Sequence, residues 1–573
     1  MKTKIPVIIL LLVFAVLTIS SMRQNSATCD EIAHHIPVGY VLLTKADFKM
    51  DTSQPPLPRY IVALPLKLFM NIDMPDDKAV WRAADRSVFG RDFFYKYNAG
   101  QVAIVWAARL PVVLVGVLCG LLLFVWAKAL WGEKAALLSL FLYSSSPEML
   151  AHSGLATTDM IAAFFILLSC YTFWLFLKEP SMKNAVLAGL ALGLAQLSKY
   201  TAILLYPVFL LIPLLELFGI AEKLSLRGAK RRSNLALLNF FIIVLLSLIV
   251  IWAGYGFEFQ PLLKDAMRVD EKLQIAHSIA KKIFPAAGPE AIRRLDDILL
   301  KVPVPLPSHM LGIIGVLRHG QEGHNTFFLG RWSAHGSPLY FVTAFLIKTP
   351  IAAIILLLAG LMALLRRRLG MGERFILIFT VIFLAVSSLS GLKLGLRHIL
   401  PVYPFCFMIA GRSVEFLKNK AAVIAMALLI VWYAFSAFTA WPHYLGYFNE
   451  AVGGPANGYK YIRDSNVDWG QDLPSLSRYM EKNSVKEVVL EYFGQADPAV
   501  YGVHYRKFTP DEFEVPGNNI YAISAQYLEH AKWAKEHKPT ATAGHSIFIY
   551  DFTKKEAQSE PGHSFNSRHT CIQ

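Results

Sequence analysis

The sequence predicts an all-α, polytopic membrane protein with about eleven transmembrane helices and a small α/β extracytoplasmic domain at its C-terminal end. Of its 573 residues, 55% are hydrophobic and only 17% are charged, a composition too apolar for a soluble protein of this length. The apolar residues are gathered in runs near the length of about 20 residues that crosses a bilayer as a helix. After about residue 485 the pattern changes to short, strand-like segments, which indicates a separate folded region.

Eleven apolar runs are candidates for membrane spans. They cover residues 5–21, 102–127, 134–150, 157–177, 184–197, 200–218, 236–256, 338–365, 374–390, 399–417 and 421–440. The first run follows a short basic N-terminus, which is also the pattern of a cleaved signal peptide. We favour a retained helix, because cleavage would detach the segment that anchors the adjacent acids Asp30 and Glu31.

Basic residues predict the orientation of these spans. Lys and Arg fall mainly in short clusters between apolar runs, such as 227–232 and 366–368, and the short basic loops all lie on one side if the N-terminus is cytoplasmic. The net charge of +15 therefore reflects topology and does not indicate nucleic acid as a partner. The same orientation places two long loops, 22–101 and 257–337, and everything after residue 440 outside the cytoplasm.

Three regions follow from this topology. They are a transmembrane domain at 1–440, an outer segment at 441–484 that contains "DSNVDWGQD", and a small extracytoplasmic α/β domain at 485–573. In the last region "VKEVVLEYFG", "NNIYAISAQYL" and "HSIFIYDF" predict strands, and "QYLEHAKWAKEHK" predicts a helix. In the first outer loop, residues 55–69 combine apolar and basic residues, as in a segment that lies along the membrane interface. The five cysteines show neither paired nor metal-type spacing, so we expect no disulfide framework.

Charged residues at the outer ends of the predicted spans are the candidate functional residues. They are Asp30, Glu31, His152, Asp159, Lys199, Lys348, Lys393, Arg397 and His398. Each has an ordinary interpretation, since an acid such as Asp159 can cap a helix and a lysine such as Lys199 can extend from a helix end to the interface. Ionisable groups at membrane depth are costly, however, and several acids and bases on one face of one membrane indicate a site.

Acids facing bases at a membrane surface suit the transfer of a group from a lipid phosphate to a hydroxyl. A carboxylate can accept the proton of the attacking hydroxyl, and Lys or Arg can stabilise the departing phosphate. The main alternative is a secondary transporter or a channel-like protein. Transporters usually have repeated halves and a site near the midplane, whereas the sequence has no evident halves. A non-catalytic scaffold would not need these acids and bases together.

Several motifs resemble one family. "CDEIAHHIPVGYVLL" followed by "QPPLPRYIVALPL" resembles the first outer loop of the protein O-mannosyltransferase-like glycosyltransferases (glycosyltransferase family 39-like), which include the bacterial aminoarabinose transferases of lipid A. The similarity continues in "HSGLATTD", "GLAQLSKYTAILLYP", "YFVTAFLIKTP", "GLRHILPVYPF" and "YFNEAVGGPANGYKYIRDSNVDWGQDL". These blocks cover residues 1 to about 475, in an order and on a membrane side that agree with the predicted topology.

The resemblance implies a GT-C-type fold and an inverting sugar transfer. The donor would be a polyprenyl-phosphate sugar, the acceptor a hydroxyl of a protein, lipid A or another glycan, and the site extracytoplasmic on the inner (plasma) membrane. Matching motif by motif gives these roles: Asp30, the general base or acceptor-orienting acid; Glu31, its neighbour; Asp159, the second acid; His34, the histidine after the acid pair; and Lys199, Arg397 and Lys348, basic residues near the donor phosphate.

The stretch "DSNVDWGQD" has the alternating oxygen side chains of a calcium loop at Asp464, Asn466 and Asp468. Trp469 stands at the position that requires glycine and Ser475 at the twelfth position, so a calcium loop is not expected. Two interpretations stay open: a loop that satisfies its own backbone, or the family's loop that closes over the sugar, with Asp464 and Asp468 contacting substrate. No metal site is assigned, and a divalent cation is left open as the one cofactor.

Overall fold

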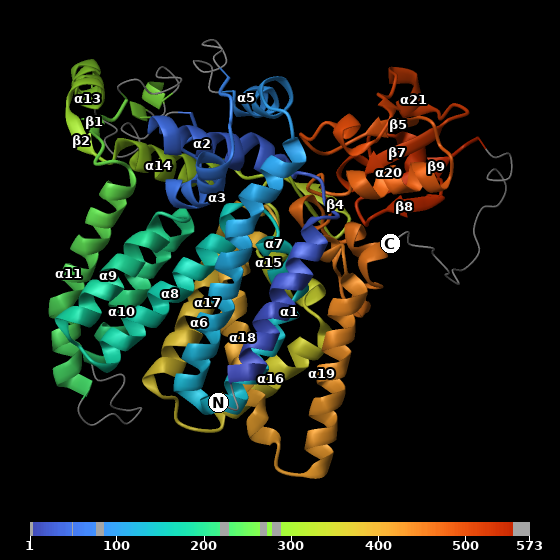
Figure 1. Cartoon of the computed structure of the whole chain (residues 1–573). Coiled ribbons are helices and arrows are strands. Elements are labelled where there is room, and N and C mark those ends of the chain that lie inside the picture. Colours follow the sequence, from blue (N-terminus) through green and yellow to red (C-terminus); the bar gives the residue numbers. More distant parts are fainter. Residues whose placement is uncertain are drawn as a thin grey trace. The chain divides into compact units, whose positions relative to one another are not determined.

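The computed structural model describes residues 4–48, 50–75, 85–217, 229–263, 272–274, 276–277 and 288–553 (Figure 1). The chain divides into two compact units. The first comprises Met1–Ile32, Ala99–Phe164 and Glu322–Gln573, and the second comprises Ala33–Asn98 and Phe165–Gln321. Parts of the two predicted outer loops, part of the basic cluster at 227–232, and residues 554–573 of the predicted α/β domain lie outside the described residues.

The first unit is a bundle of apolar helices. Its helices are α1 (Lys4–Met22), α6 (Gln101–Ser144), α7 (Pro147–Ser153), the start of α8 (Thr158–Lys178), α15 (Tyr340–Lys348), α16 (Ile351–Leu365), α17 (Met371–Leu389), α18 (Tyr403–Gly411) and α19 (Lys420–Ala440). Non-helical backbone angles at Gly132 break α6 in two, which matches the separate runs predicted at 102–127 and 134–150. The run predicted at 338–365 is instead two helices, α15 and α16, that meet at 113°.

Glycines let these helices approach closely. A Cβ atom at Gly360 of α16 would lie 1.9 Å from the carbonyl oxygen of Ile409 in α18. One at Gly411 would lie 2.1 Å from the hydroxyl of Ser139 in α6. Small residues at helix contacts are typical of membrane bundles, where van der Waals packing replaces the hydrophobic effect as the force that holds helices together.

The described residues include six helices long and apolar enough to cross a membrane, and a seventh if α15 and α16 form one bent span. The six are Lys4–Met22, Gln101–Ser144, Thr158–Lys178, Met371–Leu389, Leu396–Phe416 and Lys420–Ala440. Shorter apolar helices occupy other predicted runs, at Tyr200–Leu214 and Asn239–Gly254. The chain is thus a multi-pass membrane protein, and the count of eleven spans stays a prediction.

The second unit combines shorter helices with one small sheet. Its elements are α2 (Ile36–Lys45), α3 (Pro56–Phe69), α5 (Arg86–Asp92), α9 (Met182–Gln196), α10 (Leu205–Leu217), α11 (Ala229–Gly254), α13 (Pro289–Lys301), α14 (Pro307–Glu322) and the antiparallel strands β1 (Phe259–Pro261) and β2 (Pro303–Pro305). Buried Val41, Leu197, Ile251 and Tyr255 belong to its core.

The amphipathic segment predicted at 55–69 forms helix α3. Val62 and Leu66 are buried, whereas Leu64, Leu68 and Phe69 are exposed, Phe69 by 82%. A helix with apolar residues on its solvent side suits an interfacial position in a membrane protein.

A five-stranded sheet forms the C-terminal part of the first unit. Its strand order is β6 (Tyr505–Arg506), β5 (Val488–Glu491), β7 (Ile520–Ser524), β9 (Ile547–Asp551) and β8 (Ala541–Ala543). Strand β5 runs parallel to β6 and β7, while β9 runs antiparallel to β7 and β8. Helix α20 (Leu473–Lys482) contacts β8, and α21 (Pro510–Glu514) precedes β7. Figure 1 shows this sheet at the end of the first unit's helices that is away from the N-terminus.

The three predicted strands are confirmed as β5, β7 and β9, and the two shorter strands, β6 and β8, were not predicted. The helix predicted for "QYLEHAKWAKEHK" is wrong. The chain forms two short 3₁₀ turns there, Ala525–Tyr527 and Lys532–Lys535. Trp533 explains the difference, because its ring packs against Tyr521 and Tyr550 and its indole N–H donates to the carbonyl of Glu512 at 2.8 Å. These tertiary contacts override the local helical propensity.

Candidate functional site

The adjacent acids Asp30 and Glu31 follow α1, and their side chains bind different arginines. Glu31 is fully buried. Its two carboxylate oxygens accept hydrogen bonds from Nε and Nη2 of Arg109, each at 2.7 Å. They also accept the backbone N–H groups of Thr28 and Ala156, each at 2.8 Å. Glu31 therefore has no capacity left for a substrate.

Arg109 is the residue that the sequence interpretation missed. It lies within α6 and is fully buried. Besides Glu31, it donates to the carbonyls of Met22 (3.0 Å) and Ser26 (2.8 Å), so it joins the end of α1 to α6. Burial alone would raise the pKa of Glu31, but Arg109 and the two backbone N–H groups lower it. A single arginine in the run predicted at 102–127 was the available signal, because a charge inside a span needs a partner.

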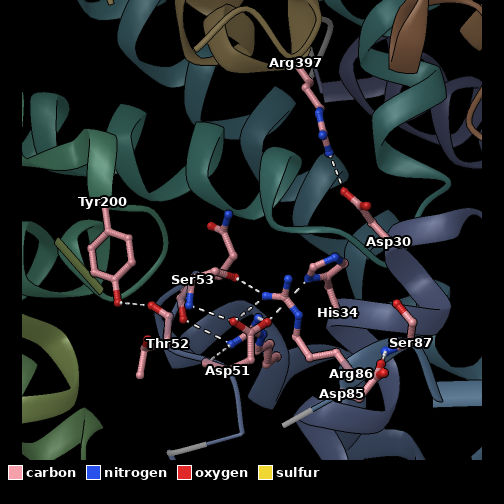
Figure 2. A network of polar contacts seen from close by, with 12 residues as sticks. Asp30, His34, Asp51, Thr52, Ser53, Asp85, Arg86, Ser87, Tyr200 and Arg397 are labelled. Carbon is pink, nitrogen blue, oxygen red and sulfur yellow. Dashed lines mark hydrogen bonds and ion pairs between the residues drawn. The ribbon is translucent and has the colours of Figure 1, made fainter. Parts of the chain in front are cut away.

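Asp30 instead forms an ion pair that solvent can reach. Its Oδ2 accepts a hydrogen bond from Nη1 of Arg397 at 2.7 Å, and Figure 2 shows the two side chains pointing at each other. Their exposed fractions are 21% and 13%. The guanidinium also lies over the ring of Trp469, 4.2 Å from its centroid. In addition, Nε of Arg397 donates to the carbonyl of Leu394 at 3.1 Å. Asp30, Trp469 and Leu394 together therefore orient the guanidinium.

Asp159, the second predicted acid, lies in the first turn of α8. It is buried, and one carboxylate oxygen accepts the hydroxyl of Thr157 at 3.2 Å. The N-terminus of a helix favours a carboxylate, because the backbone N–H groups there point towards it.

Lys348 is at the C-terminal end of α15 and is 1% exposed. Its ammonium is 3.0 Å from Oε1 of Glu148 and donates to the carbonyls of Leu445 (2.8 Å) and Asn466 (2.7 Å). Two of the three N–H donors of the ammonium go to these carbonyls, and Glu148 balances its charge. Glu148 was missed in the sequence, where it is an ordinary first-turn acid of a short helix after Ser146.

The "DSNVDWGQD" segment is held by contacts within itself and by contacts to other parts of the chain. Asp468 is fully buried, and its Oδ1 accepts the backbone N–H of Gly470 at 3.0 Å, which is the geometry of an Asx turn. Burial raises the pKa of Asp468 to about 8. Asp464 has a positive φ of 59° and a partly exposed carboxylate, 3.8 Å from Nε2 of His324. Asp468 thus fits the interpretation of a loop that satisfies its own backbone. Of the two acids, Asp464 is the one whose carboxylate is partly exposed.

The side-chain amide of Asn466 has protein partners. It accepts the backbone N–H of Leu396 (2.8 Å) and donates to the hydroxyl of Tyr340 (2.8 Å) and the carbonyl of Arg463 (2.7 Å). Across the part of the chain that the structure describes, no group of three or more His, Cys, Asp or Glu has the arrangement of a metal site.

His34 and Lys199 belong to the second unit. Nδ1 of His34 is 3.4 Å from Oδ2 of Asp51, a buried acid that also pairs with Arg59 and, at 2.9 Å, with Arg86 (Figure 2). Burial opposes ionisation of Asp51, yet Arg59, His34 and Arg86 lower its pKa well below the usual value. This cluster was not foreseen. Arg59 lies in a motif that carried the resemblance, but its partners Asp51 and Arg86 lie outside those motifs.

Lys199 is buried and immediately precedes the 3₁₀ turn Tyr200–Leu204. The hydroxyl of Tyr200 donates to the carbonyl of Thr52 at 2.9 Å, as Figure 2 shows. The structure thus brings Asp30, Glu31 and Arg397 of the predicted site residues together in the first unit, and the role predicted for Lys199 stays a prediction.

The family described as dolichyl-phosphate-mannose-protein mannosyltransferase matches residues 103–253. No curated protein matches the chain significantly. Among solved structures, ArnT from Cupriavidus metallidurans bound to undecaprenyl phosphate aligns with 97% of this chain and 99% of its own, at 12% identity and a TM-score of 0.47. The Archaeoglobus fulgidus oligosaccharyltransferase tethered to an acceptor peptide aligns with 93% of this chain and 72% of its own, at 12% identity and a TM-score of 0.46.

The S. cerevisiae Pmt1–Pmt2 complex bound to its sugar donor aligns with 47% of this chain and 37% of its own, at 18% identity and a TM-score of 0.33. The family match confirms the resemblance that the motifs indicated. The matched residues include Arg109, Glu148 and Asp159.

Proposed function

We propose that the chain transfers a sugar from a polyprenyl-phosphate donor to a hydroxyl acceptor at the outer face of the membrane, with inversion at the anomeric carbon. The observation that carries the proposal is the partly exposed ion pair of Asp30 and Arg397. It combines a proton acceptor and a phosphate-binding cation at one point, next to a buried ion pair that fixes the backbone around it.

The reaction is a single displacement. The acceptor oxygen attacks the anomeric carbon while Asp30 takes the hydroxyl proton. The bond from that carbon to the phosphate oxygen breaks, and its electron pair leaves with the polyprenyl phosphate. Arg397 stabilises the charge of this leaving group through N–H donors that Asp30 and Leu394 do not use, in a partly water-excluded site where such contacts are strong. One displacement inverts the configuration.

The remaining predicted residues have supporting roles in this proposal. Asp159 is the second acid, Lys199 and His34 assist the donor side, and Asp464 contacts the sugar. The small sheet domain after residue 485 contributes to acceptor selection, since the motif similarity ends at about residue 475.

Transfer can be tested on the purified, full-length protein in lipid nanodiscs. Radiolabelled undecaprenyl-phosphate donors carrying mannose, glucose or aminoarabinose are incubated with membranes of the deletion strain as the acceptor source. We expect label in an acceptor fraction and stoichiometric release of undecaprenyl phosphate with at least one donor. No transfer from any of these donors would overturn the proposal.

The outer-face location has its own test. A reporter that is active only in the cytoplasm is fused after Gln573. A cytoplasmic N-terminus followed by eleven spans puts this end outside, so we expect the reporter to be silent. An active reporter would reverse the proposed side.

A further inference from the structure

The bend between α15 and α16 is bound to residues 445–466, a segment that lies about 100 residues later. Pro350 cannot donate a hydrogen bond, so carbonyls at the end of α15 need other partners. The side-chain amide of Asn449 donates to the carbonyls of Leu346 (2.6 Å) and Thr349 (2.8 Å), and its backbone N–H donates to that of Ile347 (2.8 Å). Polar backbone groups inside a membrane protein must be satisfied in this way.

Lys348, at the same bend, extends this attachment. Its ammonium holds the carbonyls of Leu445 and Asn466 while Glu148 balances its charge. The ammonium also lies 4.7 Å from the ring centroid of Phe448. A buried cation that is bonded to two carbonyls and paired with a carboxylate is a fixed anchor for the segment.

The segment anchored by Lys348 in turn fixes the backbone beside Arg397. The side chain of Asn466 accepts the N–H of Leu396, and the hydroxyl of Ser465 donates to the carbonyl of Leu394 at 2.8 Å. Gly395 lies between these two contacts with a φ of 101°, and a Cβ atom there would be 2.3 Å from the Ser465 hydroxyl. The three residues before Arg397 are therefore clamped on both sides.

We propose that Asn466 and Lys348 are positioning residues that set Arg397 against Asp30, an inference that rests on the proposed function. Asn466 acts on the backbone at Leu396, and Lys348 acts on Asn466 through its carbonyl. This assigns Lys348 a role different from the phosphate contact that the family resemblance implies. Positioning errors of about 1 Å can lower a rate by about 100-fold, so loss of the clamp should be visible in turnover.

A double-mutant cycle tests whether Asn466 acts through Arg397. Asn466→Ala is made alone and together with Arg397→Ala, and sugar transfer is measured for each. If Asn466 acts through Arg397, its loss costs about 10-fold in the parent and less than about 2-fold in the Arg397→Ala background, because interacting residues are non-additive. Equal losses in both backgrounds, or no loss in the parent, would overturn the proposal.

Two further variants accompany the double-mutant cycle: a smaller change at Ser465 and a control at Asn457. Ser465→Ala removes one hydroxyl contact and should fold even if Asn466→Ala does not. It is expected to cost about 2-fold to 3-fold, with the same non-additivity. Asn457→Ala, in the same segment, is the control and should leave transfer unchanged in both backgrounds.

Lys348 is tested with its charge partner. The double variant Lys348→Met/Glu148→Gln removes both charges from the buried pair, and Lys460→Met on the surface is its control. If Lys348 only positions Arg397, the variant lowers kcat for transfer and is non-additive with Arg397→Ala. A rise in donor KM alone, additive with Arg397→Ala, would make Lys348 a donor contact and overturn the assignment.

A structural readout separates this inference from the proposed function. A cryo-EM structure of Asn466→Ala in a nanodisc should show the Arg397 guanidinium displaced from Asp30, whether or not the parent transfers sugar. An unchanged Asp30–Arg397 pair would overturn the positioning role. If the parent transfers no sugar and Arg397 is displaced, only the proposed function fails.

Discussion

Two ion pairs of the first unit involve adjacent acids, Asp30 and Glu31, and the pairs differ in exposure. Glu31 and Arg109 are both 0% exposed, and the carboxylate oxygens of Glu31 have two donors (Oε1) and three donors (Oε2). Asp30 and Arg397 share one hydrogen bond at 2.7 Å and keep part of their surface open. The two adjacent acids therefore differ in their surroundings, and the exposure of each carboxylate distinguishes them.

The difference shows how this site is constructed. A buried pair is costly to break, because the remaining charge is left without a partner in a medium of low dielectric constant. A partly exposed pair is worth little to stability, but it can exchange its contacts with a substrate. The buried pair therefore fixes the backbone, and in the proposed reaction the exposed pair supplies the chemistry.

The largest expected effect comes from breaking the buried pair. Glu31→Ala leaves Arg109 buried without its carboxylate, which should lower the free energy of unfolding by about 3 to 5 kcal/mol. Thermal unfolding in detergent, followed by size-exclusion chromatography, measures the loss. The matched control is Glu290→Ala, which removes an exposed ion pair to Arg294 and should cost less than about 1 kcal/mol. Equal stability of the two variants would contradict the comparison.

The next effect concerns activity alone. Asp30→Asn keeps the size of the side chain but removes the proton acceptor, so transfer should fall by about 100-fold or more. Unfolding should change by less than about 1 kcal/mol. Transfer kinetics and donor binding are measured on this variant, with Asp511→Asn on the surface of α21 as the control. Near-normal transfer would leave Asp30 as part of an ordinary helix start, because Asn caps a helix about as well as Asp.

Variants of Arg397, the partner of Asp30, test the other half of the exposed pair. Arg397→Ala removes a charge-assisted contact to the leaving phosphate, and transfer should fall by at least about 10-fold, equivalent to about 1.4 kcal/mol. Arg397→Lys keeps the charge and loses the planar fork, so it should lie between the parent and the alanine variant. Donor kinetics at saturating acceptor provide the measurement. Parent-like kinetics in both variants would remove Arg397 from the phosphate site.

Asp468, a buried acid for which the described residues show no ion pair, gives an effect that appears only when the pH is varied. Burial raises its pKa to about 8, with Asp472 and Asp464 adding repulsion, whereas an unfolded aspartate has a pKa of about 3.9. The folded state therefore keeps a proton that the unfolded state loses. The contribution of Asp468 to the free energy of unfolding is therefore fully present below about pH 4. It declines as the pH rises to about 8, by at most about 1.4 kcal/mol per pH unit.

Asp468→Asn removes this titration. Its unfolding temperature relative to the parent should rise by a few degrees between pH 5 and pH 8 and level off above pH 8. Melting curves of both proteins across that pH range give the difference in unfolding temperature. Because other groups titrate in both proteins, their effects cancel in this difference. A constant difference would mean that Asp468 is ionised in the folded protein.

The sequence predicted the helical membrane class, the three main strands and the residues Asp30 and Arg397. Periodicity and motif order suffice for these, because they are properties of short segments. The bend at Pro350 had a visible signal, since a proline disfavours helix in the residue before it. The apolar run around it was long enough to suggest a single span instead.

The partners of the charged residues could not be predicted in the same way. Glu31 and Arg109 are 78 residues apart, and Asp30 and Arg397 are 367 apart. Nothing local distinguishes which of two adjacent acids binds which arginine. Asn466 was noted only as one position of a rejected calcium loop, because its function depends on the backbone of Leu396, which only the folded chain brings near.

The separation between Asp30 and Arg397 has a consequence for biosynthesis. Asp30 leaves the ribosome more than 300 residues before Arg397 is made, and Trp469 and Asn466 follow later still. The Glu31–Arg109 pair needs only the first two predicted spans, so it can form early during insertion. The Asp30–Arg397 pair must wait for more than two thirds of the chain. A chain that ends in α19 would lack Asn466 and Trp469, so under the proposed function it would be an inserted bundle that cannot act on lipid-linked sugar.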